Sequence, residues 1–291
     1  MLRLVLPKGS LERATLELFS AADLTVRRSS DVDYAATIED PRVSDVRILR
    51  PQEIATYVEE GLFDLGITGR DWVEETAADV VSLGELRYSK ATSSPIRVVL
   101  AVGADSSVEK VGDLADGCRV ATEYPRLTQR FLAERGIKAD VRFSYGATEA
   151  KVPDIADAVV EITETGRALR AAGLRIIETL LVSYTELICN RASAEDPAKL
   201  HAMNQLLVLL QGALEARGKV LVKLNVSAED LDGVIAVLPA MKSPTVSKLF
   251  REEAFAVETV VPKSEINVLI PALKDRGATD IIELDLSKIV H

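Results

Sequence analysis

The sequence feature that most constrains the fold is the repeated alternation of short β-branched runs with helical periodicity. Residues 2–6 and 46–49 are strand-like, and they precede segments with helical spacing at 11–22 and 51–60. This alternation is typical of α/β domains. Further strands are predicted at 65–68, 80–83, 97–102, 119–122, 141–143, 158–162 and 175–179. This set of strands is too large for one small sheet, so we expect two lobes.

A stretch with Ser and Pro at residues 89–95 is predicted to be a hinge from the first lobe into the second. The apolar run at 180–189 would return the chain to the first lobe. A cleft between two such lobes is expected to hold a ligand. The predicted organisation is lobe I at 1–90 with a return segment at 180–195, lobe II at 91–179, a connecting helix at 196–217 and a C-terminal domain at 218–291.

The C-terminal domain has a different order of elements. It is predicted as a strand at 220–224, a helix at 227–238, strands at 245–249 and 255–261, a helix at 264–277 and a strand at 280–284. This βαββαβ order is the ferredoxin-like unit. In its second helix the spacing of Ile266, Leu269, Ile270 and Leu273 predicts one stripe buried against a sheet.

Charge and composition exclude several classes of function. The formal net charge of −10 disfavours general binding of nucleic acid or anionic lipid. The chain has two histidines, His201 and His291, and its cysteines, Cys118 and Cys189, lie in separate apolar runs, so neither zinc nor a disulfide is expected. No apolar run reaches the roughly 18 residues of a membrane span. The N-terminus is unlike a signal peptide, so we expect a cytoplasmic protein.

The most informative motif is ADAVVEITETGRAL at residues 156–169, an apolar strand followed by a small polar loop and a helix. Ionised Asp157 and Glu161 would accept hydrogen bonds from sugar hydroxyls. The Thr-Glu-Thr-Gly loop would present hydroxyls and backbone N–H groups to a phosphate. Together they fit a ribose phosphate. The alternative is structural, with Thr165 capping a helix and Gly166 easing a turn.

Two other segments have weaker signals. In GITGRD, Gly66 and Gly69 would let the backbone approach a ligand, and Thr68 and the N–H groups that follow it would receive a pyrophosphate. In PKGSL, Lys8 would bind an anion. Alternatively, GITGRD is only a tight connection between a strand and a helix, and Lys8 is a solvated charge.

Six segments in register resemble motifs of one family. They are PKGSL, RPQEIATYVEEG, DLGITGRDWVEE, VATEYP, ADAVVEITETG and LP-x-MKSPTV. The resemblance is to the long form of ATP phosphoribosyltransferase, the first enzyme of histidine biosynthesis, and it extends over nearly the whole chain. It implies a two-lobed α/β catalytic region like type II periplasmic binding proteins, followed by a ferredoxin-like, ACT-like regulatory domain.

The resemblance also implies a reaction. A phosphoribosyl group would pass from phosphoribosyl pyrophosphate to N1 of ATP, giving phosphoribosyl-ATP and pyrophosphate, and histidine would inhibit the enzyme. Mg²⁺ would arrive on the substrate phosphates, with no direct protein ligand assigned. The family forms homodimers and homohexamers, and neither a nucleic-acid nor a membrane partner is implied.

The same resemblance assigns roles to individual residues. Catalytic roles fall to Asp157 and Glu161. The residues implied for phosphoribosyl pyrophosphate are Thr163, Glu164, Thr165, Gly166, Arg167, Ala168, Lys8, Arg50, Gly69 and Asp71. Those implied for ATP are Lys8, Gly9, Leu11, Thr122 and Tyr124, the last by aromatic contact with adenine. Histidine would meet Ser243 and Thr245, although Ser-Pro-Thr is also an ordinary turn before a strand.

Three positions depart from the family pattern. Asp154 stands where the family usually has Gly, Glu161 where it has Asp, and Ala168 where it has Thr. The last change removes a hydroxyl from the phosphate loop. Backbone N–H groups and the remaining Thr hydroxyls would then have to hold the phosphate.

Two alternatives remain open at the level of sequence. A prephenate-dehydratase-like enzyme would share the two-lobed architecture and an amino-acid-sensing tail, but it needs no ribose-phosphate loop. A non-catalytic two-lobed sensor of a small anion is the other. In that protein Asp157 and Glu161 would repel the ligand unless hydroxyls or a metal intervened.

Overall fold

The structure is a computed structural model that describes residues 1–88, 94–239, 243–250 and 252–291. The chain divides into two compact units, residues 1–208 and residues 209–291. Within the described part of the first unit, one sheet forms lobe I and another forms lobe II. No helix among the described residues is long and apolar enough to cross a membrane.

Lobe I is built on a sheet with the strand order β2-β3-β4-β1-β5-β12-β6. Its strands are β1 (Leu2–Pro7), β2 (Val26–Arg27), β3 (Ala35–Ile38), β4 (Val43–Leu49), β5 (Leu65–Gly69), β6 (Val80–Leu86) and β12 (Thr185–Asn190). Its helices are α1 (Glu12–Ala21), α2 (Pro51–Glu59), α3 (Arg70–Thr76) and α6 (Arg191–Glu195), with a 3-10 turn η1 (Gly9–Leu11). The α/β alternation predicted from the sequence is confirmed.

The parallel strands β4, β1 and β5 form the centre of lobe I. Parallel strands end at the same edge of a sheet, so the turns that follow them gather there. We call residues 8–11, 50–52 and 70–72 the carboxyl edge of lobe I. This arrangement brings together turns that are distant in the sequence, as expected for a ligand site.

Gly66, expected to admit a ligand, has a packing role instead. A Cβ atom at this position would lie 2.8 Å from the side chains of Ile54 and Val5. Helix α2 therefore packs directly on strand β5 only because residue 66 has no side chain. Thr68 is likewise fully buried, and its hydroxyl donates to the carbonyl of Pro51 at 3.1 Å. The expectation that Gly66 and Thr68 meet a substrate is wrong.

Lobe II has the strand order β11-β7-β10-β8-β9. Its strands are β7 (Ile96–Gly103), β8 (Cys118–Thr122), β9 (Ala139–Phe143), β10 (Ala158–Thr163) and β11 (Leu174–Ser183). Its helices are α4 (Pro125–Ala133) and α5 (Arg167–Ala171), with 3-10 turns η2 (Val111–Asp113) and η3 (Thr148–Lys151). Strands β10, β8 and β9 are parallel, so residues 123–125, 144–148 and 164–166 form the carboxyl edge of lobe II.

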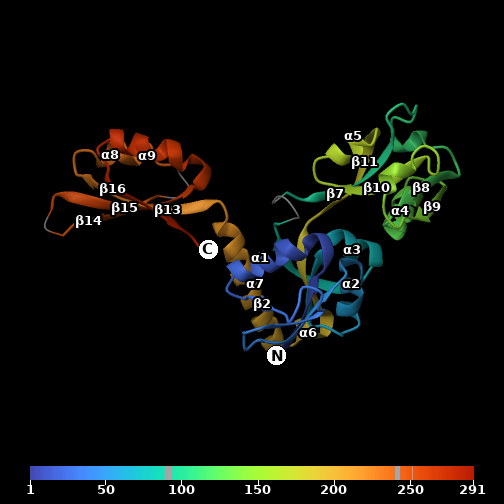
Figure 1. Ribbon diagram of the computed structural model, residues 1–291, viewed down its shortest axis with the longest axis horizontal. Coiled ribbons are helices and arrows are strands. Elements are labelled where there is room, and N and C mark those ends of the chain that lie inside the picture. Colours follow the sequence, from blue (N-terminus) through green and yellow to red (C-terminus); the bar gives the residue numbers. More distant parts are fainter. Residues whose placement is uncertain (89–93, 240–242, 251) are drawn as a thin grey trace. The chain divides into compact units, whose positions relative to one another are not determined.

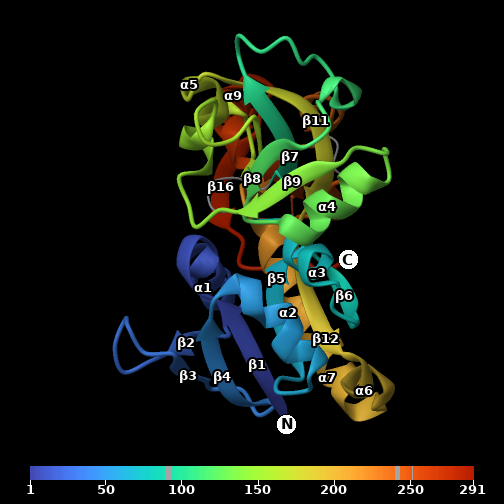
Figure 2. The same ribbon diagram turned by 90° about the vertical axis from the view of Figure 1, so that its right-hand side faces the viewer.

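The chain returns to lobe I later than the sequence indicated. Strand β11 stays paired with β7 up to the Ser183–Ile96 pair, and β12 begins to pair with β5 at Thr185. The return expected at residue 180 is therefore corrected to Tyr184. Figure 2 shows gold β12 running beside β5 in lobe I. Of the hinge expected at 89–95, residues 89–93 lie outside the described residues.

Within the second unit, helices α8 (Leu231–Ile235) and α9 (Ile266–Asp275) lie on one face of the sheet (Figure 1). The strand order is β14-β15-β13-β16, with β13 (Lys219–Ser227), β14 (Thr245–Lys248), β15 (Ala254–Pro262) and β16 (Thr279–Asp285). The predicted stripe of α9 is confirmed, since Ile266, Leu269 and Leu273 are buried. This is the predicted ferredoxin-like order.

The first helix of this unit is shorter than the predicted 227–238. Strand β13 continues to Ser227, whose hydroxyl accepts the N–H of Asp230 at 3.2 Å and forms a turn before the helix. Ser227 therefore closes a turn instead of capping the predicted helix. In the MKSPTV motif, Met241 and Lys242 lie outside the described residues, while Ser243 and Thr245 are exposed.

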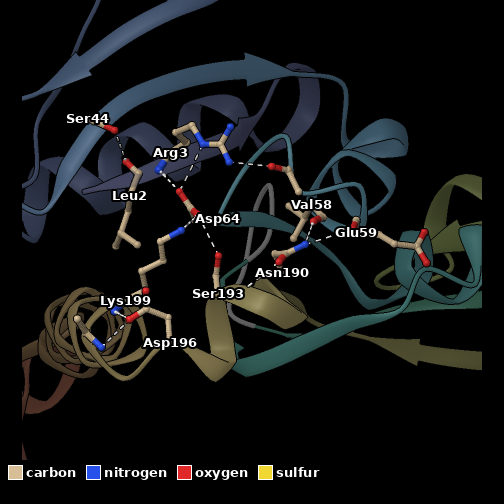
Figure 3. A network of polar contacts seen from close by, with 12 residues as sticks. Leu2, Arg3, Ser44, Val58, Glu59, Asp64, Asn190, Ser193, Asp196 and Lys199 are labelled. Atoms are coloured by element: carbon tan, nitrogen blue, oxygen red, sulfur yellow. Dashed lines mark hydrogen bonds and ion pairs between the residues drawn. The ribbon is translucent and has the colours of Figure 1, made fainter.

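Asp64, at the start of β5, ties lobe I to the helix α7 (Pro197–Ala216). Its carboxylate accepts the backbone N–H of Arg3 at 2.7 Å, the hydroxyl of Ser193 at 2.9 Å and the Lys199 ammonium at 2.7 Å (Figure 3). Burial alone would raise the pKa of Asp64. The hydrogen bonds from Lys199, Arg3 and Ser193 and the positive charge of Lys199 outweigh burial and lower that pKa.

Candidate functional site

A cavity of about 340 Å³ lies between the carboxyl edges of the two lobes. Lobe I contributes Leu11, Gly69 and Asp71 to its lining. Lobe II contributes Tyr124, Thr163 and Glu164, all of them predicted from the sequence. The cavity is also lined by Trp72, Tyr88, Glu123, Ser183 and Tyr184, which sequence reasoning missed. The fold thus joins predicted residues from the GITGRD, VATEYP and ADAVVEITETG segments.

Asp71 joins the two lobes at one side of this cavity. Its carboxylate accepts the Tyr124 hydroxyl at 2.8 Å and the Ser183 hydroxyl at 2.6 Å. The Ser183 oxygen in turn accepts the Asp71 backbone N–H at 3.0 Å. The rings of Trp72 and Tyr124 pack with centroids 4.6 Å apart. Gly69 is needed here, because a Cβ atom at residue 69 would collide with the Asp71 carboxylate.

Among the described residues, the hydrogen-bond partners of the Asp71 carboxylate are the hydroxyls of Tyr124 and Ser183, and no cation pairs with it. Burial raises its pKa, and the hydrogen bonds from Ser183 and Tyr124 only partly oppose this. Burial and the nearby Asp71 carboxylate likewise raise the pKa of Tyr124 well above its ordinary value. A buried carboxylate with a raised pKa at the edge of a cavity is a common mark of a functional site.

A second contact between the lobes was not anticipated. The Glu75 carboxylate, on α3 of lobe I, accepts the backbone N–H groups of Arg126 at 3.0 Å and Leu127 at 2.9 Å. These groups belong to the first turn of α4 in lobe II, where helix N–H groups lack partners within the helix. Pro125 at the first helical position is the only local signal, and it marks the helix start without revealing its partner.

The predicted phosphate loop is a tight turn closed by its own side chains. The Thr163 hydroxyl oxygen accepts the N–H of Gly166 at 2.7 Å, and Gly166 has a φ of 73°. A Cβ atom at residue 166 would lie 2.8 Å from the guanidinium of Arg170. Thr163 and Glu164 line the cavity, whereas Thr165, Arg167 and Ala168 are exposed or half-exposed beyond its lining. Gly166 eases the turn as the alternative interpretation expected, but helix α5 begins after Gly166 without a side-chain cap, so Thr165 does not cap it.

Glu161 lies in β10, beside the cavity-lining residues Ile162 and Thr163. Its carboxylate accepts the N–H of Ile162 at 2.9 Å. Burial raises the pKa of Glu161, and the neighbouring carboxylates of Glu123 and Glu149 raise it further. The carboxylate therefore stands in an acidic pocket at the carboxyl edge of lobe II.

Asp157 does not join this cluster. It precedes β10 at the end opposite Thr163, about 20 Å away along the strand. Its carboxylate accepts three hydrogen bonds from Arg119, including one of 2.7 Å from the guanidinium. These bonds and the charge of Arg119 lower the pKa of Asp157. The prediction that Asp157 and Glu161 act together is corrected, because a strand points its two ends at opposite edges of the sheet.

The remaining predicted residues surround the cavity without lining it. Lys8 lies 3.9 Å from the centre of the Tyr34 ring, and Gly9 donates its N–H to Glu12 at 3.2 Å. Arg50 is exposed at the start of α2. Thr122 is buried, and its hydroxyl accepts the N–H of Tyr124 at 2.9 Å. Thr122 thus orients Tyr124, while Lys8 and Arg50 are placed at the carboxyl edge of lobe I.

A larger cavity of about 850 Å³ lies at the other edge of lobe II. Asp157 lines it together with loop residues such as Ser106, Asp113 and Asp116. Its lining lacks the convergent hydroxyls and the contacts between lobes that mark the smaller cavity. We therefore place the functional site at the smaller cavity, where titratable groups with raised pKa values gather.

No group of three or more His, Cys, Asp or Glu side chains among the described residues is arranged to hold a metal ion. The acidic side chains near the cavity thus do not form a protein-only metal site.

Comparison with known proteins gives consistent results along the chain. The family model described as "ATP phosphoribosyltransferase" matches residues 50–212, and that described as "HisG, C-terminal domain" matches residues 216–288. The ATP phosphoribosyltransferase of Pelotomaculum thermopropionicum is 50% identical over 99% of this chain and 99% of its own length. That of Desulforudis audaxviator is 47% identical over 99% of each chain.

A solved structure shares the fold of the catalytic region. It is an ATP phosphoribosyl transferase (HisG:HisZ) complex from Thermotoga maritima, with a TM-score of 0.62 and 24% identity. The match covers 72% of this chain and 99% of the other. The two-lobed, periplasmic-binding-protein-like fold predicted from the sequence is confirmed, as is the presence of the family's C-terminal domain.

Proposed function

Because the chain belongs to the ATP phosphoribosyltransferase family of pentosyltransferases, we propose that it transfers a phosphoribosyl group from phosphoribosyl pyrophosphate to N1 of ATP. The products would be phosphoribosyl-ATP and pyrophosphate. This reaction would open L-histidine biosynthesis, and histidine would inhibit it. The protein would work in the cytoplasm.

The observation that carries the proposal is the meeting of three family-like segments at one cavity. Gly69 and Asp71 come from lobe I, Tyr124 from the VATEYP segment, and Thr163 and Glu164 from the phosphoribosyl loop. These residues are far apart in the sequence. A two-substrate transfer needs such a site, because both substrates must be held with their reacting atoms aligned.

The phosphoribosyl pyrophosphate would lie along the carboxyl edge of lobe II. The turn at 163–166 would hold the 5′-phosphate through backbone N–H groups and Thr hydroxyls, with Arg167 and Ala168 in the following turn. Ionised Glu161 would face the ribose, where positive charge develops at C1 as the pyrophosphate leaves. Asp157 is left out of this assignment because it pairs with Arg119 at the other edge.

The adenine of ATP would lie on the opposite side of the cavity. Tyr124 and Trp72 form the aromatic wall there, and Leu11 adds an apolar contact. Lys8, Arg50 and the Gly9 turn stand at the same edge of lobe I and would meet phosphate groups. Mg²⁺ would enter as part of the substrate, bound to the pyrophosphate oxygens, and no step is assigned to a protein-bound ion.

The C-terminal unit would be the regulatory domain, residues 218–291, joined to the lobes by the helix of residues 196–217. Histidine would bind there near Ser243 and Thr245, which are exposed at the start of β14. The chain would assemble into homodimers and homohexamers. Strand β14 is the edge of its sheet, and an unpaired edge of this kind can join to another subunit.

The test is a direct assay of product. Purified chain would be mixed with ATP, phosphoribosyl pyrophosphate and Mg²⁺, with pyrophosphatase present, and phosphoribosyl-ATP followed by its ultraviolet absorbance. We expect product that requires all three components and falls when histidine is added. Absence of product under all conditions would refute the transferase proposal, and product insensitive to histidine would refute only the regulatory part.

A further inference from the structure

Two backbone N–H groups at the start of α4 need acceptors from outside the helix. The first helical residue, Pro125, has no N–H group, and the N–H of Thr128 donates to the carbonyl of Tyr124 at 3.0 Å. The N–H groups of Arg126 and Leu127 remain, and they have no acceptor within α4 itself. In most helices a side chain of the preceding loop accepts such groups.

The acceptor for α4 comes from lobe I. Tyr124 is at the N-cap position, and within the described residues its side chain makes no capping hydrogen bond. Instead, the two carboxylate oxygens of Glu75 accept the N–H of Arg126 at 3.0 Å and that of Leu127 at 2.9 Å. Glu75 is 7% exposed, so water competes little for these bonds. One carboxylate thus completes the first turn of a helix in the opposite lobe.

Helices α3 and α4 satisfy each other's ends at this contact, where they lie side by side (Figure 2). The Arg126 guanidinium donates to the carbonyl of Thr76, the last residue of α3, at 3.2 Å. Carbonyls at the end of a helix lack partners within it, just as N–H groups do at the start. A more exposed ion pair joins Glu74 of α3 to Arg130 of α4 at 2.9 Å.

The contact bears on the cavity because Tyr124 immediately precedes the capped turn. Its hydroxyl donates to Asp71 at 2.8 Å, and its ring packs on Trp72 with centroids 4.6 Å apart. Asp71 and Trp72 precede Glu75 by four and three positions, so the three side chains lie on one side of α3. Helix α3 therefore holds Tyr124 by its hydroxyl, by its ring and through the turn that follows it.

We propose that Glu75 is a positioning residue for the transfer reaction, which caps α4 from lobe I and so fixes Tyr124 at the wall of the cavity. This inference rests on the proposed function, in which Tyr124 contacts the adenine of ATP. Among the described residues, Glu75 is not part of the cavity lining. It therefore acts through Tyr124 and does not touch a substrate.

The test compares three variants of α3. Glu75→Gln keeps the size of the side chain, but its amide has one acceptor oxygen and an NH₂ donor in place of two acceptor oxygens. Glu75→Ala removes both acceptors, and Glu75→Gln carries the test if this variant does not fold. Glu74→Gln is the matched control, because it makes the same chemical change at the neighbouring position and removes a contact between the lobes that solvent screens.

The first readout needs no substrate. Trp72 is the single tryptophan of the chain and packs on Tyr124, so the accessibility of its indole reports on this contact. In Glu75→Gln we expect acrylamide to quench Trp72 fluorescence about twofold more efficiently than in the wild type, because loss of the cap increases local opening. Quenching should be more efficient still in Glu75→Ala, and Glu74→Gln should match the wild type.

The second readout is the KM for each substrate. Because Tyr124 is assigned to ATP, Glu75→Gln should raise the KM for ATP about fivefold, as loss of a helix cap implies, and leave that for phosphoribosyl pyrophosphate within about twofold. A double-mutant cycle with Tyr124→Leu tests the route. If Glu75 acts through Tyr124, Glu75→Gln adds little to the effect of Tyr124→Leu.

The outcomes separate this inference from the proposed function. Unchanged quenching and an unchanged KM for ATP in both Glu75 variants would overturn the inference, as would an equal change in Glu74→Gln. Equal rises in both KM values, or a full effect of Glu75→Gln in the Tyr124→Leu background, would also overturn it, because Glu75 would then not act through Tyr124. Increased quenching in a protein that makes no phosphoribosyl-ATP would support the positioning of Tyr124 by Glu75 and refute the proposed function.

Discussion

Strands β5 and β10 each have a carboxylate near both ends, and the two ends differ in their surroundings. At the amino ends, Asp64 faces Lys199 and Asp157 faces Arg119. Near the carboxyl ends, Asp71 accepts from two hydroxyls and Glu161 from a backbone N–H, and neither has a cation partner in the part of the chain that the structure describes. The pKa is lowered for the first two and raised for the last two.

The charge of the partner and the depth of burial together explain the difference. Asp64 is 3% exposed and Asp71 is 2% exposed, yet the pKa values of these two carboxyls move in opposite directions. The Lys199 cation favours the ionised form of Asp64, whereas Asp71 lies in more completely dehydrated surroundings, where hydroxyl and N–H donors only partly oppose the effect of burial. Carboxylates with cation partners therefore support the fold, whereas Asp71 at the cavity and Glu161 beside it have no such partner among the described residues.

The largest effect on activity is expected when the charge of Glu161 is removed. Glu161→Gln keeps the shape of the side chain and removes the negative charge proposed to face the ribose. We expect kcat/KM for phosphoribosyl pyrophosphate to fall on the order of 10²-fold, measured by product formation, since stabilisation of developing charge is lost. Histidine binding, followed by calorimetry, should be unchanged. Unaltered kinetics would remove Glu161 from the site.

Asp64→Asn tests the carboxylate at the amino end of β5, which pairs with the Lys199 cation. The change leaves Lys199 without its partner, and we expect the free energy of unfolding at pH 7 to fall by about 2–3 kcal/mol in urea titrations. The folded-state pKa of Asp64 is lowered, so its stabilising contribution is complete above about pH 4 and is lost as pH falls through that lowered value. The two proteins should converge in acid. A loss of activity without a loss of stability would contradict a purely structural role.

Asp71→Asn should have a smaller effect on stability, and of the opposite sign. The folded-state pKa of Asp71 is raised, so its ionisation in the folded protein lowers stability as pH rises above about 4. Asn has no such cost, and the hydroxyls of Tyr124 and Ser183 can rotate to pair with it. We expect a gain of up to about 1 kcal/mol at pH 7 by the same urea titration, accompanied by slower turnover. A large loss of stability would contradict the assignment.

The smallest effect is expected for Asp157→Asn. Arg119 and Asp157 are both substantially exposed, so their ion pair is screened by solvent. We expect kcat/KM to stay within about twofold of wild type in the product assay. A loss as large as that of Glu161→Gln would restore Asp157 to the site.

Most of the difference between the two ends of these strands could not be predicted from the sequence. The alternation of strands and helices predicted the two α/β lobes, the Thr-Glu-Thr-Gly loop indicated Thr163, and the family resemblance supplied Asp71 and Tyr124. Asp157 was grouped with Glu161 because both belong to one acidic strand, and the strand's length places them at different edges. Proximity in sequence is a poor guide to proximity at a site whenever a strand lies between the residues.

Contacts between residues far apart in the sequence were equally difficult to predict from it. Glu75 meets the first turn of α4 across 51 positions, and Ser183 meets Asp71 across 112. Neither pair has a local pattern, because each depends on how two lobes face one another. Gly66 illustrates the reverse error, in which a glycine resembling a ligand contact serves the packing of α2 on β5.

The most direct test of the account is a crystal structure of the chain with phosphoribosyl pyrophosphate bound. We expect the 5′-phosphate against the turn at 163–166 and the ribose beside Glu161, in the cavity that Asp71 and Tyr124 line. A ligand bound beside Asp157 and Arg119, at the other edge of lobe II, would contradict it.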